Sequence, residues 1–156
     1  RGIACWQKST GPTRRYAGTA HIDVAAVSAS EGQELVAALG EKGQEISALG
    51  YYPNPLHPDA AHREAVIEHL KKVIAAAPKV GVKVVNTFIG RDWTKNVEAN
   101  LAAFREVWPE IVKHAEAHKV NIGIENCPML FSNDEWPGGK NLAISPAVWA
   151  RDGVRR

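Results

Sequence analysis

Apolar and polar residues follow two rhythms along the chain, and these predict strands and helices in turn. Short runs of branched and aromatic residues predict four strands, beginning near residues 2, 45, 82 and 120. Between these runs, apolar residues recur every three or four positions, as on one face of an amphipathic helix. Because a helix separates each strand from the next, the strands are expected to be parallel. The pattern therefore predicts an α/β fold.

The first predicted helix is the shortest. A capping-box pattern at Ser30 and Gln33 is expected to begin it, and Gly43 is expected to end it. Its predicted apolar stripe consists of Leu35, Val36 and Leu39. The second helix is predicted over residues 59–77, where Pro78 ends it because proline lacks an N–H group.

The third helical segment is predicted over residues 95–118, and Pro109 either kinks it or begins a second helix. Its predicted inner side consists of Val97, Leu101, Phe104, Val107, Ile111 and Val112. A further helix is expected to begin within residues 145–149. Strand–helix units of this length fit a βα barrel or a doubly wound sheet. No Gly-x-Gly-x-x-Gly or phosphate-loop pattern follows a strand, which disfavours a nucleotide-binding open sheet.

Composition narrows the class of protein. Of the 156 residues, 45% are hydrophobic and 23% are charged, which is ordinary for a globular domain. The net charge of +2 and the lack of a basic run do not favour a nucleic-acid partner, and no segment is apolar enough to span a membrane. The two cysteines, Cys5 and Cys127, fit no zinc spacing, so reduced thiols in the cytoplasm are expected.

The strand at residues 120–125 ends in a carboxylate. If Val120, Ile122 and Ile124 face the helices, Glu125 points to the opposite face at the C-terminal end of the strand. Active sites of βα barrels assemble at that end. A divalent cation would compensate the charge of a carboxylate there. An ion pair with a lysine or arginine, or exposure to solvent, is the alternative.

Other candidate site residues also follow predicted strands. His57 lies in a proline-rich loop, where it either contacts a substrate hydroxyl or is simply solvated. Either Asn86 or Thr87 should face the lumen, and the pattern does not decide which. Three tryptophans at strand ends are candidates for the wall of a sugar pocket, or for loop packing: Trp6, Trp93 and Trp136.

Four segments carry a resemblance to a known family: ISALGYYPNPLHPD (46–59), VVNTFIG (84–90), VNIGIENCP (120–128) and EWPGGKNLAISPAVW (135–149). They resemble the xylose-isomerase-like TIM-barrel superfamily, the sugar phosphate isomerases and epimerases, and IGIEN is the most specific motif. The resemblance implies a partial TIM (β/α) barrel that contains strands two to five of a full barrel. It is strongest over residues 44–149, whereas 150–156 are atypical.

In this family, Glu125 corresponds to the first ligand of a divalent metal, Mn²⁺, Mg²⁺, Co²⁺ or Zn²⁺. The resemblance implies proton transfer on a sugar or sugar phosphate through an enediolate, with Glu125 as metal ligand and catalytic residue and His57, Trp6, Asn86, Trp93 and Trp136 around the substrate. The other family ligands, an Asp, a His and a second Glu, belong to later strands. We therefore expect residues 1–156 to be a single, incomplete barrel domain from a truncated member.

Two alternatives stay open at this stage. A non-catalytic half barrel would expose the edges of its sheet and self-associate through them. A metal nuclease specific for abasic sites uses the same barrel, but it needs additional histidines at strand ends. At those positions the chain has Tyr51, Tyr52 and Phe88.

Overall fold

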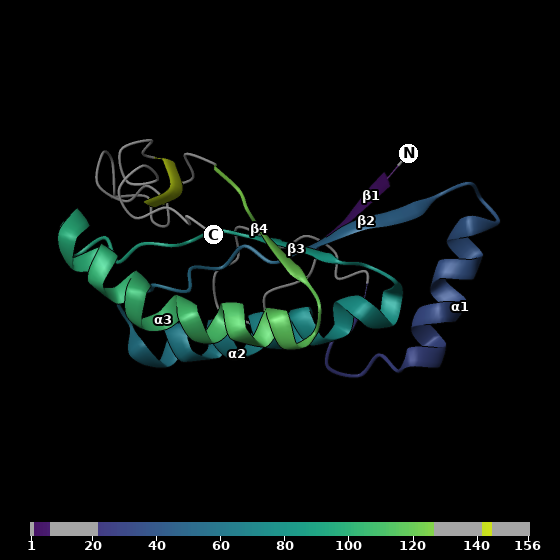
Figure 1. The fold of residues 1–156 in the computed structure, drawn as a ribbon, viewed down its shortest axis with the longest axis horizontal. Helices are drawn as coiled ribbons and strands as arrows, with labels where there is room; N and C mark the ends of the chain where they lie inside the picture. The colour runs from purple at the N-terminus through teal and green to yellow at the C-terminus, as the bar shows by residue number, and fades with distance from the viewer. Residues whose placement is uncertain (1, 7–21, 127–141, 145–156) are drawn as a thin grey trace.

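The computed structural model describes residues 2–6, 22–126 and 142–144, and the backbone alone for residues 2–6. Within these residues, four parallel strands form one sheet in the order β1-β2-β3-β4 (Figure 1). The strands are β1 (Gly2–Trp6), β2 (Glu45–Gly50), β3 (Val84–Thr87) and β4 (Asn121–Ile124). The helices are α1 (Ala29–Gly40), α2 (Ala60–Ala76) and α3 (Val97–Ala117), with short 3₁₀ turns η1 (Ala77–Val80) and η2 (Leu142–Ile144). The predicted α/β fold of parallel strands alternating with helices, a partial TIM barrel, is confirmed.

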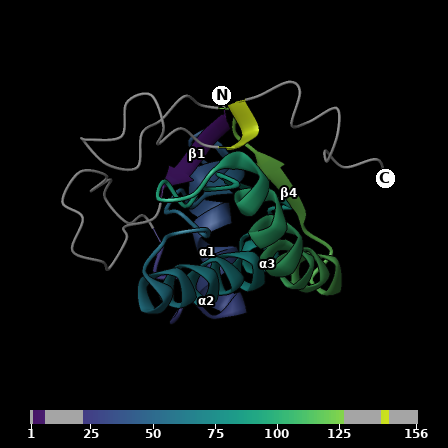
Figure 2. The same cartoon turned by 90° about the vertical axis from the view of Figure 1, so that its left-hand side faces the viewer.

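The α-helices lie on one face of the sheet (Figures 1 and 2). α2 and α3 run side by side beneath the strands, and α1 packs against η1 and β2. A hydrophobic cluster fills the space between the two layers, and its fully buried members include Leu70, Val73, Ile74, Val85 and Ile111. None of the described α-helices lies on the opposite face of the sheet.

Strand β2 contains a bulge that keeps its apolar residues on the helix side. Ile3 of β1 pairs with Ile46, whereas the next residue, Ala4, pairs with Ala48, so Ser47 is an extra residue on β2. One extra residue resets the alternation of side chains along a strand. Ile46 and Leu49 therefore both pack on the hydrophobic cluster although three positions separate them.

Helix α1 begins two residues before the predicted capping box. Ser28 is the N-cap: its Oγ accepts a hydrogen bond from the Glu31 N–H, and the Glu31 carboxylate accepts one from the Ser28 N–H. The hydroxyl of Ser30 instead donates to Glu34, so the prediction of a cap at Ser30 was wrong. The helix ends at Gly40, before the predicted Gly43. Val36 is 41% exposed and does not belong to the inner stripe.

Helices α2 and α3 lie where they were predicted. Asp59 caps α2 by accepting a hydrogen bond from the His62 N–H at 2.7 Å, and η1, with Pro78 in its first turn, follows the last residue of α2. α3 continues through Pro109 as one helix, so the alternative of a second helix beginning there was wrong. Val112, predicted to face inward, is 43% exposed, while Trp108 is buried.

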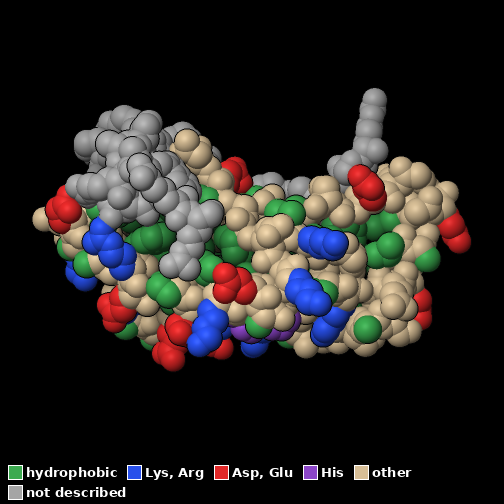
Figure 3. Space-filling view, viewed as in Figure 1, with side chains coloured by type: hydrophobic (Ala, Val, Ile, Leu, Met, Phe, Trp, Pro, Cys, Tyr) green, Lys and Arg blue, Asp and Glu red, His purple; other side chains and the backbone are tan. Residues whose placement is uncertain are grey.

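The surface of this layered unit is mixed in charge. Acidic and basic side chains are interspersed on the face in Figure 3, in keeping with a net charge of +2. Across the described segments, none of the helices combines the length and the apolar character needed to cross a bilayer.

Candidate functional site

The candidate site lies at the C-terminal ends of β2, β3 and β4, on the helix-free face of the sheet. The register pairs Gly50 with Asn86 and Asn86 with Gly123, and it pairs Trp6 of β1 with Gly50. Paired positions on parallel strands share a face, so these residues form one row across the sheet. Val85, next to Asn86, belongs to the hydrophobic cluster under the sheet, and Asn86 accordingly faces the other side.

Asn86, rather than Thr87, is the polar side chain on the helix-free face. Its Oδ1 occupies the place that a Cβ on Gly123 would take, so the amide lies directly over the neighbouring strand. Thr87 is fully buried and its hydroxyl donates to the Phe88 carbonyl oxygen at 3.4 Å. The structure thus decides between the two residues that the sequence left open.

An aromatic pair lies one row beyond Asn86. The rings of Tyr52 and Phe88 are 4.8 Å apart at 54°. The Tyr52 ring folds back over Gly50, where an added Cβ would lie 2.9 Å from its Cε2 atom. Phe88 is buried yet lies outside the hydrophobic cluster beneath the sheet. The pair therefore lies one row further along the same face as the Asn86 amide.

Glu125 directly follows β4 and lies in the same row as Phe88. Its N–H donates to the Thr87 carbonyl oxygen at 2.9 Å, which extends the parallel ladder one residue past Ile124. Because Thr87 pairs with Ile124, Glu125 lies in line with Phe88. Val120, Ile122 and Ile124 all pack on the hydrophobic cluster, as predicted, and Glu125 is exposed.

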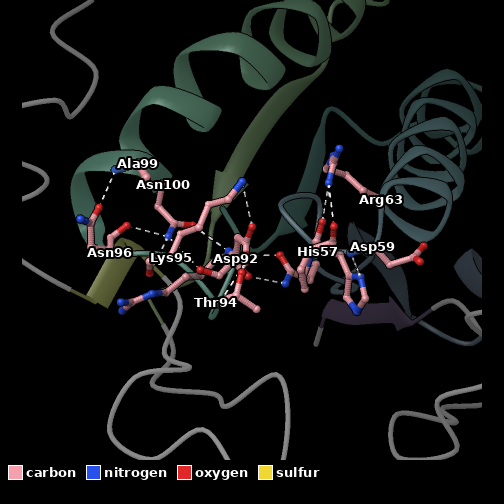
Figure 4. A network of polar contacts seen from close by, with 12 residues as sticks. His57, Asp59, Arg63, Asp92, Thr94, Lys95, Asn96, Ala99 and Asn100 are labelled. Atoms are coloured by element: carbon pink, nitrogen blue, oxygen red, sulfur yellow. Dashed lines mark hydrogen bonds and ion pairs between the residues drawn. The ribbon is translucent and has the colours of Figure 1, made fainter.

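The loops after β2 and β3 bring His57 and Trp93 into contact. Their rings are 4.8 Å apart in an edge-to-face arrangement at 84°, and both side chains are half-buried. The Arg63 guanidinium donates to the His57 carbonyl oxygen at 2.7 Å and fixes the loop backbone onto the first turn of α2 (Figure 4). Arg63 thus holds the backbone of His57, and the Trp93 ring packs against the His57 side chain.

The state of the His57 ring follows from its surroundings. The Asp59 N–H donates to Nδ1 at 3.1 Å, so the neutral ring carries its proton on Nε2. Partial burial and the neighbouring His62 ring, 4.2 Å away, lower the pKa of His57. His57 is therefore neutral at pH 7, with Nε2 as a hydrogen-bond donor.

Asp92 and Asn100 hold the β3–α3 loop in shape (Figure 4). Asn100 is fully buried; its Oδ1 accepts from the Asp92 N–H at 2.7 Å, and its Nδ2 donates to the Asp92 carbonyl oxygen at 2.9 Å. Although burial by itself raises the pKa of Asp92, hydrogen bonds from Thr94 and the charge of Lys95 outweigh it, and the pKa of Asp92 is lowered. Asp92 is thus a structural carboxylate.

The sequence-predicted site residues divide into three groups. Glu125, Asn86, His57 and Trp93 all follow or end strands at the same edge of the sheet. Trp6 is placed by its backbone register alone, and Trp136 lies outside the described residues. Their functional roles stay predictions.

Sequence reasoning gave no role to Tyr52, Phe88 or Asn54. Tyr52 follows Gly50 by two positions, and Phe88 follows Asn86 by two. This spacing places them on the same face of the sheet and could have indicated that they belong to the site. Asn54 had no such signal, since its partner Arg91 is 37 residues away. Within the described part of the chain, no three His, Cys, Asp or Glu residues group closely enough to hold a metal ion. Glu125 is therefore not part of a complete metal shell among these residues.

Comparison with known proteins identifies the family. The family model described as xylose isomerase-like TIM barrel matches residues 7–145. No curated protein matches the chain.

Several solved structures share the fold. A xylose isomerase domain protein from Planctomyces limnophilus has a TM-score of 0.53 at 13% identity, over 65% of this chain and 40% of that chain. A D-psicose 3-epimerase solved in the presence of D-fructose has a TM-score of 0.52 at 18% identity, over 72% and 40%. The D-psicose 3-epimerase with D-tagatose from Clostridium cellulolyticum H10 has 0.51 at 21%, over 70% and 39%. The chain thus spans about 40% of the length of the first two structures.

At these identities the structural likeness concerns the fold, whereas the family model covers most of the sequence. The chain belongs to the xylose isomerase-like TIM-barrel family.

Proposed function

We propose that this chain provides one side of the pocket of a metal-dependent sugar isomerase or epimerase. The observation that carries the proposal is the row at the strand ends, in which the Glu125 carboxylate follows the Tyr52–Phe88 aromatic pair, with the Asn86 amide one row deeper. Carboxylate, amide and aromatic face are the three groups that sugar recognition combines: hydroxyls need hydrogen-bond partners, and the C–H face of a sugar packs on rings.

Glu125 suits one position in a divalent metal site. It is an exposed carboxylate at the catalytic end of a parallel sheet, and hard cations prefer oxygen ligands. A divalent cation held there would draw electron density from the substrate oxygens and favour loss of a proton from the adjacent carbon. Its remaining ligands would come from outside the described residues.

The chain's own residues would bind the sugar and transfer its proton. Asn86 would donate through Nδ2 and accept through Oδ1 at neighbouring hydroxyls, and His57 would donate through Nε2 because Nδ1 is already engaged. Glu125 would accept a proton from the carbon next to the carbonyl group, leaving an enediolate, and a second carboxylate on the opposite face would return one. Return to the other carbon gives isomerisation, and return to the other face gives epimerisation.

Relatives support a ketose as the substrate class. Two structures with this fold are D-psicose 3-epimerases solved with D-fructose and D-tagatose. Each is a longer chain, of which this one spans 40% and 39% respectively. A free or phosphorylated ketose is therefore the first substrate to test. Turnover by residues 1–156 alone is not expected.

Metal binding tests the proposal without requiring turnover. Mn²⁺ added to the isotope-labelled chain should broaden backbone resonances of residues 123–126 and the side-chain amide of Asn86. Glu125→Gln removes the charge and keeps the shape, so the broadening should be lost. Glu116→Gln, an exposed change on the far side of the sheet in α3, is the matched control and should leave it intact. Broadening that persists in Glu125→Gln would show that Glu125 is not the metal ligand.

A further inference from the structure

One buried side chain, Asn54, joins the loop after β2 to the loop after β3. It is 4% exposed. Its Oδ1 accepts from the Leu56 N–H at 3.0 Å and from the Arg91 N–H at 2.9 Å, and its Nδ2 donates to the Arg91 carbonyl oxygen at 2.7 Å. The amide therefore pairs with both backbone groups of Arg91, a residue 37 positions away.

Gly90 permits this close approach. It has φ +90°, a conformation that favours glycine, and Oδ1 of Asn54 occupies the place of its missing Cβ. A Cβ there would also lie 2.9 Å from the Pro55 Cδ and 3.0 Å from the Leu56 nitrogen. The backbone of the second loop thus packs directly against residues 54–56 of the first.

A local turn alone does not require these contacts. An asparagine that accepts from the residue two positions on forms an Asx turn, and the bond to Leu56 suffices for that. The two bonds to Arg91 add nothing to such a turn; they fix the distance between the loops. Loss of Asn54 would leave backbone groups of Arg91 without this partner in a partly buried setting, which is costly.

We infer that Asn54 is a positioning residue, which we call the loop clamp: it holds the two loops so that His57 and Trp93 form one continuous wall of the candidate pocket. His57 lies three residues after Asn54 and Trp93 two residues after Arg91, and their rings meet at 4.8 Å. The joining of the loops stands on the contacts alone. The role of the joined loops in sugar binding rests on the proposed function.

Nuclear Overhauser effects between the His57 and Trp93 ring protons test the clamp in the full chain. They should be present in the wild type and lost in Asn54→Ala. The control is Asn96→Ala, which removes the N-cap of α3 from the same loop without touching the clamp, and it should keep them. Persistence of the effects in Asn54→Ala would overturn the inference, as would their loss in both variants.

If Asn54→Ala does not fold, hydrogen exchange in the wild type tests whether Asn54 joins the two loops. The Leu56 and Arg91 amides both donate to Asn54 Oδ1, so both should be protected. Free exchange at either amide would overturn the clamp. In a folded Asn54→Ala variant, both protection factors should fall about tenfold or more.

A D-fructose titration in the presence of Mn²⁺ separates the clamp from the proposed function. Weaker binding by Asn54→Ala than by Asn96→Ala supports a role in substrate positioning. Equal binding by the two variants, when Asn54→Ala no longer shows the Overhauser effects, supports the clamp and removes that role. No binding by the wild type counts against the proposed function, while the Overhauser effects still decide the clamp.

Discussion

Two glycines of this chain should respond in opposite ways to one added methyl group. A Cβ on Gly32 of α1 would overlap the Lys79 carbonyl oxygen and lie 2.8 Å from its carbonyl carbon, both backbone atoms of η1. A Cβ on Gly123 of β4 would overlap Oδ1 of Asn86, the tip of a side chain. A backbone atom cannot move aside without distorting its element, whereas an amide can rotate. Gly32→Ala therefore probes packing, and Gly123→Ala probes the candidate site.

The expected magnitudes differ accordingly. Alanine in place of glycine favours folding by about 0.5–1 kcal/mol in a helix or strand. Overpacking costs about 1–3 kcal/mol, and an overlap with backbone atoms falls in the upper half of that range, so after the gain from alanine Gly32→Ala should destabilise the fold by roughly 1–2 kcal/mol. Displacing Asn86 from its rotamer costs about 0.5–1.5 kcal/mol, which offsets the gain at Gly123. For a chain of this size, Tm should fall by about 2–8 °C in Gly32→Ala and by little in Gly123→Ala.

Thermal unfolding followed by circular dichroism measures the first effect, and the side-chain amide resonances of Asn86 report the second. Gly123→Ala should shift those resonances and weaken the Mn²⁺-induced broadening of the Asn86 amide. Gly32→Ala should do neither at a temperature where it is folded. Equal losses of Tm in the two variants, or an unmoved Asn86 amide in Gly123→Ala, would refute the reasoning.

Three further predictions concern the fold. Asn100→Ala should lower the free energy of unfolding by about 3 kcal/mol in urea denaturation, against about 1 kcal/mol for Asn96→Ala, because it leaves buried backbone groups unpaired; similar losses would contradict this. Burial and the charge of Lys72 lower the pKa of His69, although Asp23 opposes them, so the unfolded imidazole protonates first as pH falls. Stability should therefore decrease below about pH 6.5, and His69→Gln should flatten the decrease. The outer edges of β1 and β4 pair with no described strand, so sedimentation should show association that increases with concentration, and a single monomeric species throughout would argue against it.

The hydrophobic pattern predicted α2 and α3 well because each of these helices buries one clear face, whereas the helix expected to begin within residues 145–149 lies outside the described residues. The pattern failed where neighbouring residues offered equivalent choices. Ser28 and Ser30 are each followed three residues later by a Glu or Gln, so two capping boxes compete, and the extended backbone at Ser28 decides between them. Val36 follows the partly buried Leu35 and Val112 follows the buried Ile111, and the apolar pattern did not distinguish these exposed valines from their buried neighbours.

The site was predictable only as far as local pattern reaches. The position of Glu125 follows from strand alternation, and that of His57 from its place after a strand. The choice of Asn86 over Thr87 required knowledge of the adjacent strand, because the glycine that makes room for the amide is Gly123. The contacts of Asn54 join residues far apart in the sequence, and no periodicity encodes them.

The bonds of Asn54 to Arg91 also bear on how such a scaffold can be redesigned. Segments 53–59 and 88–96 share one amide, so an insertion or exchange in either segment disturbs the other. Grafting a loop from a relative into this chain should therefore succeed when both segments, with Asn54 and Gly90, are transplanted as a pair. A chimera in which only one segment is exchanged would keep its strands and helices. It would lose the hydrogen bonds that join the loop after β2 to the loop after β3.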